Sequence, residues 1–177
     1  MHEEIIISGF GGQGVLLAGK LLCIAAMREG KYVSHIPSYG AEMRGGTANC
    51  KVIISDEEIS SPVIDHPTIV IALNTPSMHK FEPKMVTNGL MLFNSSLISD
   101  KPTRTDIKVK SVKANDISEA AGSLRAANMA ALGYLLKVKP EIASMDALKH
   151  ALDEAISERN KQHNPVNIQI MEAGYQS

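Results

Sequence analysis

The stretch of sequence that decides the fold is IIISGFGGQGVLLAGKLLCIAAM, residues 5–27. It opens with three β-branched residues, Ile5 to Ile7, which favour a short strand that ends at a glycine. Val15 to Met27 is a longer apolar run of helix formers that ends near Gly30. A strand, a glycine loop and a helix are the first parts of a β-α-β unit, so Tyr32-Val33 predicts a second strand parallel to the first.

The helix predicted over residues 15–27 is apolar almost all round. Lys20 interrupts it, and Arg28 follows at its end. A helix without a polar face is buried on more than one side. We therefore expect it to be covered by the rest of the chain or by a partner.

Four further apolar runs are bounded by turn formers, at residues 52–54, 69–73, 90–93 and 107–112. Continuous apolar runs are typical of strands that are covered on both faces. The last run alternates with lysines, which is typical of an edge strand. These patterns predict a sheet whose central strands are buried between layers of helices.

The C-terminal third changes to helical spacing. One apolar stripe contains Leu124, Asn128, Ala131, Leu132 and Leu135, and a second follows Ser144, which predicts a helix N-cap there. Asn164-Pro165 predicts the start of a last short helix. We expect an α/β fold, a three-layer α/β/α sandwich with a mostly parallel sheet and a Rossmann-like opening β-α-β unit, in one domain over residues 1–177.

Charge and composition exclude several classes of function. With 18 basic and 19 acidic residues the net charge is -1, so the chain lacks the positive field of nucleic-acid-binding proteins. It has no Trp and few other aromatic residues, which disfavours a base-stacking platform. No apolar run approaches the roughly 18 residues of a membrane span, and the acidic N-terminus does not resemble a signal peptide. The sequence predicts a cytoplasmic protein that binds no nucleic acid and does not span a membrane.

Residues that could carry chemistry directly are few. Cys23 and Cys50 lie in separate apolar patterns without the spacing of metal ligands, and the six histidines form no H-x-x-x-H pair. No G-x-S-x-G elbow occurs. We therefore predict no metal site and no catalytic residue. His35, at the expected end of the second strand, either titrates near neutrality or makes a structural hydrogen bond.

The first glycine loop, GFGGQG over residues 9–14, satisfies G-x-G-x-x-G after a strand and before a helix. Its candidate binding residues are Gly9, Gly11, Gly12, Gln13 and Gly14, whose amides and helix dipole would face a phosphate. A dinucleotide site also needs an acidic residue at the end of the second strand, and residues 33–36, VSHI, contain none. Alternatively, the glycines only permit a tight turn and close packing of helix on strand.

A second glycine-rich loop, residues 37–47, follows the second predicted strand and should emerge at the same carboxyl edge of the sheet, where ligands of open α/β sheets bind. Arg44 offers a fork for a phosphate or carboxylate, and Glu42 could orient it. Alternatively, Glu42 and Arg44 form a pair that only braces the loops. The candidate binding residues here are Ser38, Tyr39, Gly40, Glu42, Arg44, Gly45 and Gly46.

Asn128 is the polar member of an apolar stripe. A buried amide without partners costs about 1–3 kcal/mol, so it must be hydrogen-bonded. We expect Asn128 to brace a backbone loop or to reach the ligand edge.

Both glycine loops together resemble the gamma subunit of the 2-oxoacid:ferredoxin (acceptor) oxidoreductases. The resemblance lies in GFGGQGV at residues 9–15 and SYGAEMRGG at residues 38–46. It continues through residues 59–62, 71–74 and 128–133, and so covers most of the chain. One departure is Pro67-Thr68, where the family commonly has Pro-Asp, and any role of that aspartate is in doubt here.

The resemblance implies that this chain is one part of a complex that oxidatively decarboxylates a 2-oxoacid and transfers the acyl group to coenzyme A. Alpha, beta and ferredoxin-like subunits would hold thiamine diphosphate with Mg and an iron–sulfur cluster, and pass electrons to ferredoxin or another acceptor. This chain would support assembly and contribute a coenzyme A contact. Two cysteines cannot ligate a four-iron cluster, and no Gly-Asp-Gly start of a thiamine diphosphate motif occurs.

The expected substrate is 2-oxoglutarate, with pyruvate or another 2-oxoacid as the alternative. A hetero-oligomer is expected, with a homodimer when partners are missing, and the isolated chain should be inactive. A different class of function, a stand-alone dinucleotide-binding oxidoreductase, remains an alternative from the first glycine loop, and a protein-binding scaffold is a third.

Overall fold

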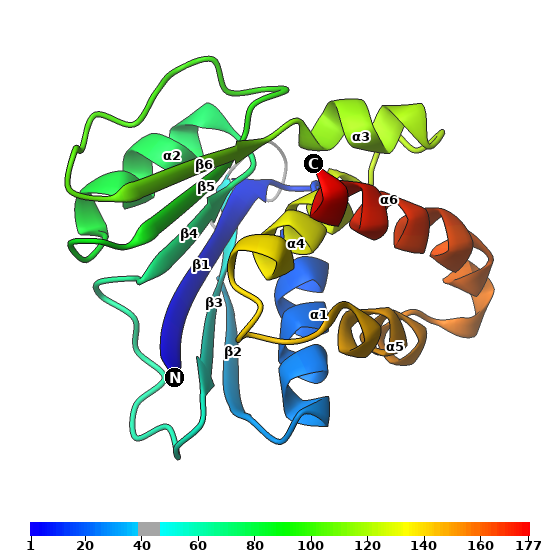
Figure 1. Ribbon diagram of the computed structural model, residues 1–177, viewed down its shortest axis with the longest axis horizontal. Coiled ribbons are helices and arrows are strands. Elements are labelled where there is room, and N and C mark those ends of the chain that lie inside the picture. Colours follow the sequence, from blue (N-terminus) through cyan, green and yellow to red (C-terminus); the bar gives the residue numbers. More distant parts are fainter. Residues whose placement is uncertain (39–46) are drawn as a thin grey trace.

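The computed structural model describes residues 1–38 and 47–177, which form a six-stranded sheet of order β2-β3-β1-β4-β5-β6 (Figure 1). The strands are β1 (His2–Phe10), β2 (Tyr32–Ser38), β3 (Thr47–Ser55), β4 (Ile69–Ala72), β5 (Leu90–Asn94) and β6 (Lys108–Val112). β1, β4, β5 and β6 run parallel, and β3 is antiparallel to both β1 and β2. The predicted α/β fold with a mostly parallel sheet is confirmed.

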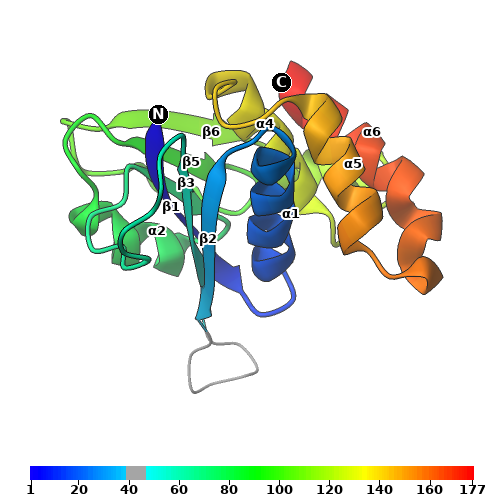
Figure 2. The same cartoon turned by 90° about the horizontal axis from the view of Figure 1, so that it is seen from below.

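Helices cover both faces of the sheet. They are α1 (Val15–Arg28), α2 (Thr75–Phe81), α3 (Ala114–Ala120), α4 (Ala127–Val138), α5 (Met145–Ala155) and α6 (Asn164–Gln176), with 3₁₀ turns at Glu82–Lys84 and Glu158–His163. Figure 2 shows α1, α4, α5 and α6 on one side of the sheet and α2 on the other. The second helical layer is therefore much smaller than the first.

The opening β-α-β unit is present, with one insertion. β2 runs parallel to β1, as predicted, but β3 lies between them and pairs with both. Ser8 of β1 and Ser38 of β2 are both paired with Asn49 of β3. The chain segments that follow β1 and β2 therefore leave the sheet at the same carboxyl edge.

The side chains of β1 are divided between two cores because successive residues of a strand point to opposite faces. Ile5 and Ile7 pack towards the layer that contains α1, and Ile6 packs towards α2. All three are at most 2% exposed. This burial on both faces explains why the strand has an unbroken apolar sequence.

α1 is buried against the sheet and against α5 and α4, and Arg28 at its end bonds Glu154 of α5. Its predicted burial on more than one side is confirmed. The cover comes from this chain, so the apolar surface of α1 does not by itself call for a partner. β6 is an edge strand with exposed Lys108 and Lys110, as its alternating sequence predicts.

Two expectations for the C-terminal third are wrong. Leu124 precedes α4 and is 78% exposed, so it does not belong to the buried stripe. The last helix, α6, is not short, since it has 13 residues. Ile170 and Met171 are buried, and Gly174 lets the helix pack closely on α4, which stabilises this length. The cap expected at Ser144 is confirmed, since its hydroxyl accepts a hydrogen bond from the amide of Ala147 at 3.1 Å.

The sequence patterns did not predict α2 and α3. The start of α2 has a readable signal, since the Asn74 side chain accepts the amide of Ser77 at 2.9 Å and Pro76 lies in the first turn. In the described part of the chain, no helix is both long enough and apolar enough to cross a membrane.

Candidate functional site

The first glycine loop forms a tight connection between β1 and α1. Phe10 is the last residue of β1 and Val15 the first of α1, so Gly11 to Gly14 make the whole turn. Gly12 has φ +95° and Gly14 has φ +69°, a backbone conformation that favours glycine. Gly14 is the N-cap of α1, which has no capping side chain and no acidic residue in its first turn. The N-terminal end of the α1 dipole is therefore not neutralised by this segment of the chain.

Gln13 fixes the loop. Its Oε1 accepts the amide of Phe10 at 2.6 Å, and its Nε2 donates to the carbonyl of Leu73 at 3.3 Å. The Asn74 amide also donates to the Gln13 Oε1 at 3.4 Å. Asn74 caps α2, so Gln13 ties the glycine loop to the start of α2. Gln13 thus has a positioning role, and its amide is occupied within the chain.

Gly9 is required for packing. A Cβ at Gly9 would lie 2.6 Å from the Gln13 Oε1 and 3.1 Å from the Leu73 Cβ. The close-packing role that the sequence left open for the glycines therefore holds at Gly9. It does not account for Gly12, where no described residue lies within 4 Å of a Cβ.

Six candidate residues of the second loop, Tyr39, Gly40, Glu42, Arg44, Gly45 and Gly46, lie outside the described residues. Ser38, the last residue of β2, is described and half-buried. Because β1 and β2 end at the same edge, the segment that follows Ser38 starts at the edge that carries the first glycine loop. The convergence of the two loops and the contacts of Arg44 stay predictions.

Asn128 joins the glycine loop to α4. Its Nδ2 donates to the carbonyl of Gly14 at 3.1 Å, so it braces a backbone loop as expected. The side chain is 2% exposed, and its Oδ1 has no hydrogen-bond partner within the described residues. A Cβ at Gly14 would lie only 2.5 Å from the Asn128 Nδ2, which explains the glycine.

Beside Gly14 the molecule has a pocket of about 590 Å³. Its walls come from the start of α1, from residues 122–129 before and in α4, and from the region where Glu158–His163 meets α6. Ser118 shapes the first of these segments, because its hydroxyl donates to the carbonyl of Ser123 and accepts the amide of Ala126. Arg125 and His163 also line the pocket, and neither belongs to a sequence motif that would single it out.

The two thiols and His35 lie elsewhere, at the contact of α1 with β2 and β3. Burial raises the pKa of both Cys23 and Cys50 to about 12, so neither is a thiolate near neutrality. His35 is in the middle of β2, not at its end. Its Nε2 faces Gly19 of α1 and has no hydrogen-bond partner within the described residues. Burial lowers the pKa of His35, and the nearby Lys20 lowers it further.

The described residues contain no group of three or more His, Cys, Asp or Glu side chains that could hold a metal ion. The two cysteines of the chain do not fit a four-iron cluster, which needs four thiolates. The described residues offer the backbone amides of the loop, the N-terminus of α1 and the guanidinium of Arg125, which are groups that favour an anion.

Comparison with known proteins gives the family. The model of the pyruvate ferredoxin/flavodoxin oxidoreductase family matches residues 4–177. The ketoisovalerate oxidoreductase subunit VorA of Methanothermobacter marburgensis is 36% identical over 97% of this chain, which spans only 35% of VorA. The 2-oxoglutarate synthase subunit KorC of Methanocaldococcus jannaschii is 32% identical over 93% of this chain and 89% of its own length.

A solved structure has the same fold. The gamma subunit of a keto/oxoacid ferredoxin oxidoreductase from Geobacter sulfurreducens matches with a TM-score of 0.86 and 26% identity, over 99% of this chain and 95% of that one. Sequence and fold thus agree along nearly the whole chain. The protein belongs to the pyruvate ferredoxin/flavodoxin oxidoreductase family.

Proposed function

We propose that this chain is the gamma subunit of a multi-subunit 2-oxoacid:ferredoxin oxidoreductase that carries out oxidative decarboxylation with transfer of the acyl group to coenzyme A. The observation that carries the proposal is the family match over residues 4–177 together with the fold shared with a gamma subunit. In this proposal the chain supports assembly of the complex and contributes to coenzyme A binding. Alpha, beta and ferredoxin-like chains are its partners.

The preferred substrate in this proposal is 2-oxoglutarate. Support comes from the KorC relative, which is matched along most of its own length, whereas the VorA relative is matched along about a third. Ketoisovalerate and pyruvate enzymes are the alternatives, and the somewhat higher identity to VorA favours the first of these. Residues that recognise the oxoacid are expected on the partner chains.

Redox and thiamine chemistry also belong to the partners in this proposal. The chain's two thiols are buried and protonated, so they can neither ligate a cluster nor carry an acyl group near neutrality. Thiamine diphosphate with Mg and the iron–sulfur cluster would be held by the alpha, beta and ferredoxin-like chains.

The proposed coenzyme contact is at the carboxyl edge of the sheet. The amides of Gly11, Gly12 and Gly14 lie at the N-terminus of α1, whose first turn has no acidic residue, and Arg44 belongs to the segment that follows Ser38 in the sequence. A helix N-terminus and a fork-shaped cation together suit a phosphate of coenzyme A. A carboxylate of a partner chain would fit the same groups.

Replacing Arg44 distinguishes the two possible binding partners of its side chain, a phosphate of coenzyme A and a carboxylate of a partner chain. If Arg44 binds a phosphate of coenzyme A, Arg44→Ala raises the KM for coenzyme A about tenfold or more, because a charge-assisted hydrogen bond contributes about 1.5–3 kcal/mol. The complex still assembles in that case. If Arg44 binds a partner's carboxylate, the subunit dissociates instead, which size-exclusion chromatography detects.

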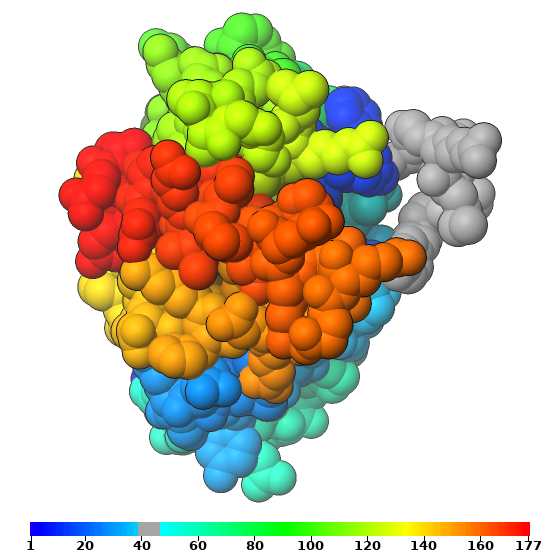
Figure 3. Space-filling view, turned by 90° about the vertical axis from the view of Figure 1, so that its right-hand side faces the viewer, coloured from blue at the N-terminus to red at the C-terminus, as the bar shows by residue number. Residues whose placement is uncertain are grey.

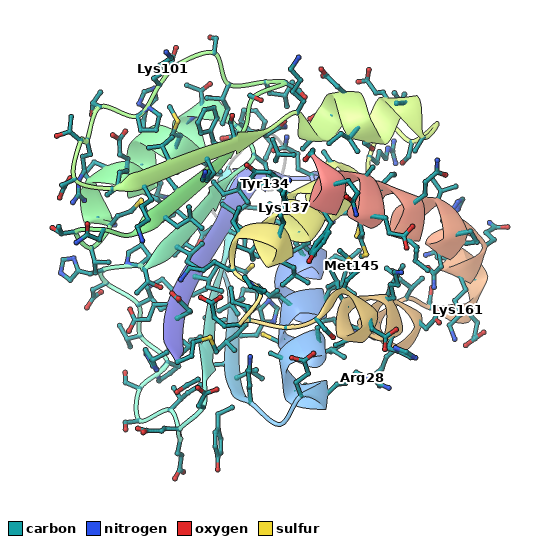
Figure 4. The ribbon with its side chains drawn as sticks, in the orientation of Figure 1. Arg28, Lys101, Tyr134, Lys137, Met145 and Lys161 are labelled. Carbon is teal, nitrogen blue, oxygen red and sulfur yellow. The ribbon has the colours of Figure 1, made fainter. Side chains whose placement is uncertain are left out.

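Arg28→Ala is the matched control for this experiment. Arg28 lies at the other end of α1, where Figure 4 labels it beside α5, and it should leave both the KM and assembly unchanged. An Arg44→Ala complex that assembles and turns over like the wild type across a coenzyme A titration would remove Arg44 from the site.

The second candidate function is a stand-alone dinucleotide-binding oxidoreductase. Its support is the G-x-G-x-x-G loop between β1 and α1. Against it, β2 ends in Ile36-Pro37-Ser38, with no carboxylate for a ribose. It predicts that the isolated chain oxidises or reduces NAD(P), which absorbance at 340 nm would detect, whereas the subunit proposal predicts no such activity.

A further inference from the structure

The sheet has two edge strands, β2 and β6, and they differ in charge. β6 has exposed Lys108 and Lys110, and lysines on an edge strand oppose its pairing with another chain. β2 contains no Lys, Arg, Asp or Glu, and its Tyr32 and Ile36 are 51% and 38% exposed. An uncharged edge with exposed apolar side chains is a surface that another strand can cover.

The outer side of β2 is open in the part of the chain that the structure describes. Its inner side pairs with β3 along its whole length, from Tyr32–Ser55 to Ser38–Asn49, and its other main contact is with α1. In Figure 2 β2 lies close to the viewer, and no described helix or strand lies in front of it. In Figure 3 α5 and α6, in orange and red, cover the middle of the helical face, and the light-blue and cyan segments appear at its margin.

Pro37 limits which part of β2 can pair. Proline has no N–H to donate, and a strand tolerates it where its nitrogen faces away from the neighbouring strand. Backbone groups of residues two apart face the same side, so by this rule those of Val33 and His35 also face the open edge. The stretch from Tyr32 to Ile36 can therefore receive a further strand.

This stretch is complementary to a second copy of itself. In an antiparallel pairing centred on Ser34, Tyr32 lies opposite Ile36 of the second copy, on one face of the sheet. An aromatic side chain opposite a β-branched one is a favourable cross-strand pair, and two-fold symmetry forms it twice. No like charges meet, whereas two β6 strands paired about their middle residue, Lys110, would oppose two lysines.

We propose that β2 is the interaction surface for a second copy of this chain. The two β2 strands pair antiparallel over Tyr32 to Ile36, and the two six-stranded sheets become one continuous sheet. The interface is isologous, since both copies use the same residues. This proposal concerns the isolated chain and is independent of the proposed function.

Sedimentation velocity of the full chain over a range of concentrations measures the association. We expect an equilibrium between monomer and dimer. Tyr32→Lys and Ile36→Glu each remove the apolar cross-strand pair at two symmetric places, so each should raise the dissociation constant of the dimer about tenfold. Val109→Lys changes a residue of β6 with a similar exposure of 41%, and it should leave the dissociation constant unchanged.

The two variants combined test the register of the pairing. In the double variant Tyr32→Lys/Ile36→Glu each introduced lysine lies opposite an introduced glutamate of the second copy, so dimerisation should recover. Within one chain the two positions are about 13 Å apart along the strand, too far for an ion pair, so recovery reports the contact between copies. Circular dichroism checks that the variants are folded, as expected for substitutions at exposed positions.

A cysteine at the centre of the pairing locates the symmetry axis. The two thiols of Ser34→Cys would lie directly opposite each other, so oxidation with diamide should give a disulfide-linked dimer. Ser111→Cys, on the exposed part of β6, is the matched control and should stay monomeric. The native Cys23 and Cys50 are buried, which keeps them out of the reaction.

Three results would overturn the proposal. They are a wild-type chain that sediments as a monomer at every concentration, a dimer that Tyr32→Lys weakens no more than Val109→Lys does, and a double variant that dimerises no better than the single ones. Each of these concerns the isolated chain, so each leaves the proposed function and its Arg44 test standing.

Discussion

Gly14 combines two constraints that usually act at separate positions. Its φ of +69° disfavours any side chain, and the Asn128 amide occupies the space that a Cβ would take. The same amide bonds the Gly14 carbonyl, so a substitution strains the loop and disturbs its brace. Position 14 should therefore be one of the least tolerant in the chain.

We expect Gly14→Ala to lower the free energy of unfolding by about 2–4 kcal/mol, of which about 1–2 kcal/mol is the left-handed backbone and the rest is overpacking. Urea unfolding measures the change. Gly30→Ala is the matched control, because Gly30 has φ +79° and no atom of the described residues lies within 4 Å of its Cβ, and it should lose only about 1–2 kcal/mol. Equal losses at the two positions would contradict the packing role of Asn128.

His35 predicts a pH dependence of stability. Its pKa is lowered in the folded protein by burial, and Lys20 acts in the same direction. As pH falls below the unfolded value of about 6.5, the unfolded chain takes up the proton first, so the stability present above that pH is lost. His35→Gln should flatten this part of the stability curve from pH 7 to 5, as measured by urea unfolding at each pH. An unchanged slope in His35→Gln would show that other groups cause the loss.

At the level of elements, the closest helix contact is that of α4 with α6. A Cβ at Gly133 would lie 1.9 Å from the Met171 carbonyl oxygen, and one at Gly174 would lie 2.2 Å from that of Ala130. Both obstacles are backbone atoms, which cannot move aside without separating the helices. This contact also holds α6, and with it His163 and Val166, against the pocket.

Gly133→Ala should therefore destabilise the protein by about 3 kcal/mol or more, since overpacking of a rigid contact exceeds the usual 1–3 kcal/mol. Gly19→Ala is the comparison within α1, where the obstacles are the Cys50 Sγ and the His35 Nε2, both side-chain atoms. It should cost less, as judged by chemical denaturation followed by circular dichroism. A larger loss for Gly19→Ala would show that the α4–α6 contact can relax.

Periodicity predicted those elements whose burial is visible in the sequence. β1, α1, the central strands and the edge strand β6 each have a pattern that follows from which of their sides is covered. The place of β3 was not predictable, because a β-branched strand has the same sequence whether it pairs on one side of β1 or the other. α2 and α3 are too short for a helical period, and only the Asn74 cap signals α2.

Only the part of the candidate site that has a local sequence pattern was predictable. The glycine loop has a local sequence signature, since positive φ values require glycine at Gly12 and Gly14. The partnership of Asn128 with Gly14 joins residues 114 positions apart, and only the fold brings them together. Arg125 and His163 have no local signature, because what places them at the pocket is the packing of α4 and α6.

For the whole molecule, the structure changes the argument for association. The apolar surface of α1 was one reason to expect partners, and it is buried within the chain by α4 and α5. The expectation of a hetero-oligomer now depends on the family and on the loops at the carboxyl edge of the sheet. Purified alone, the chain should be colourless and unable to reduce a viologen dye with any 2-oxoacid, because its thiols cannot bind a cluster.

The most direct test of the central claim is purification of this chain, with an affinity tag, from the cells that make it. We predict that chains containing thiamine diphosphate and iron–sulfur clusters co-purify with it, and that the preparation reduces a viologen dye only when a 2-oxoacid and coenzyme A are both present. Comparing 2-oxoglutarate, ketoisovalerate and pyruvate in this assay identifies the substrate. Recovery of the chain alone, or in a complex without oxidation of any 2-oxoacid, would contradict the account.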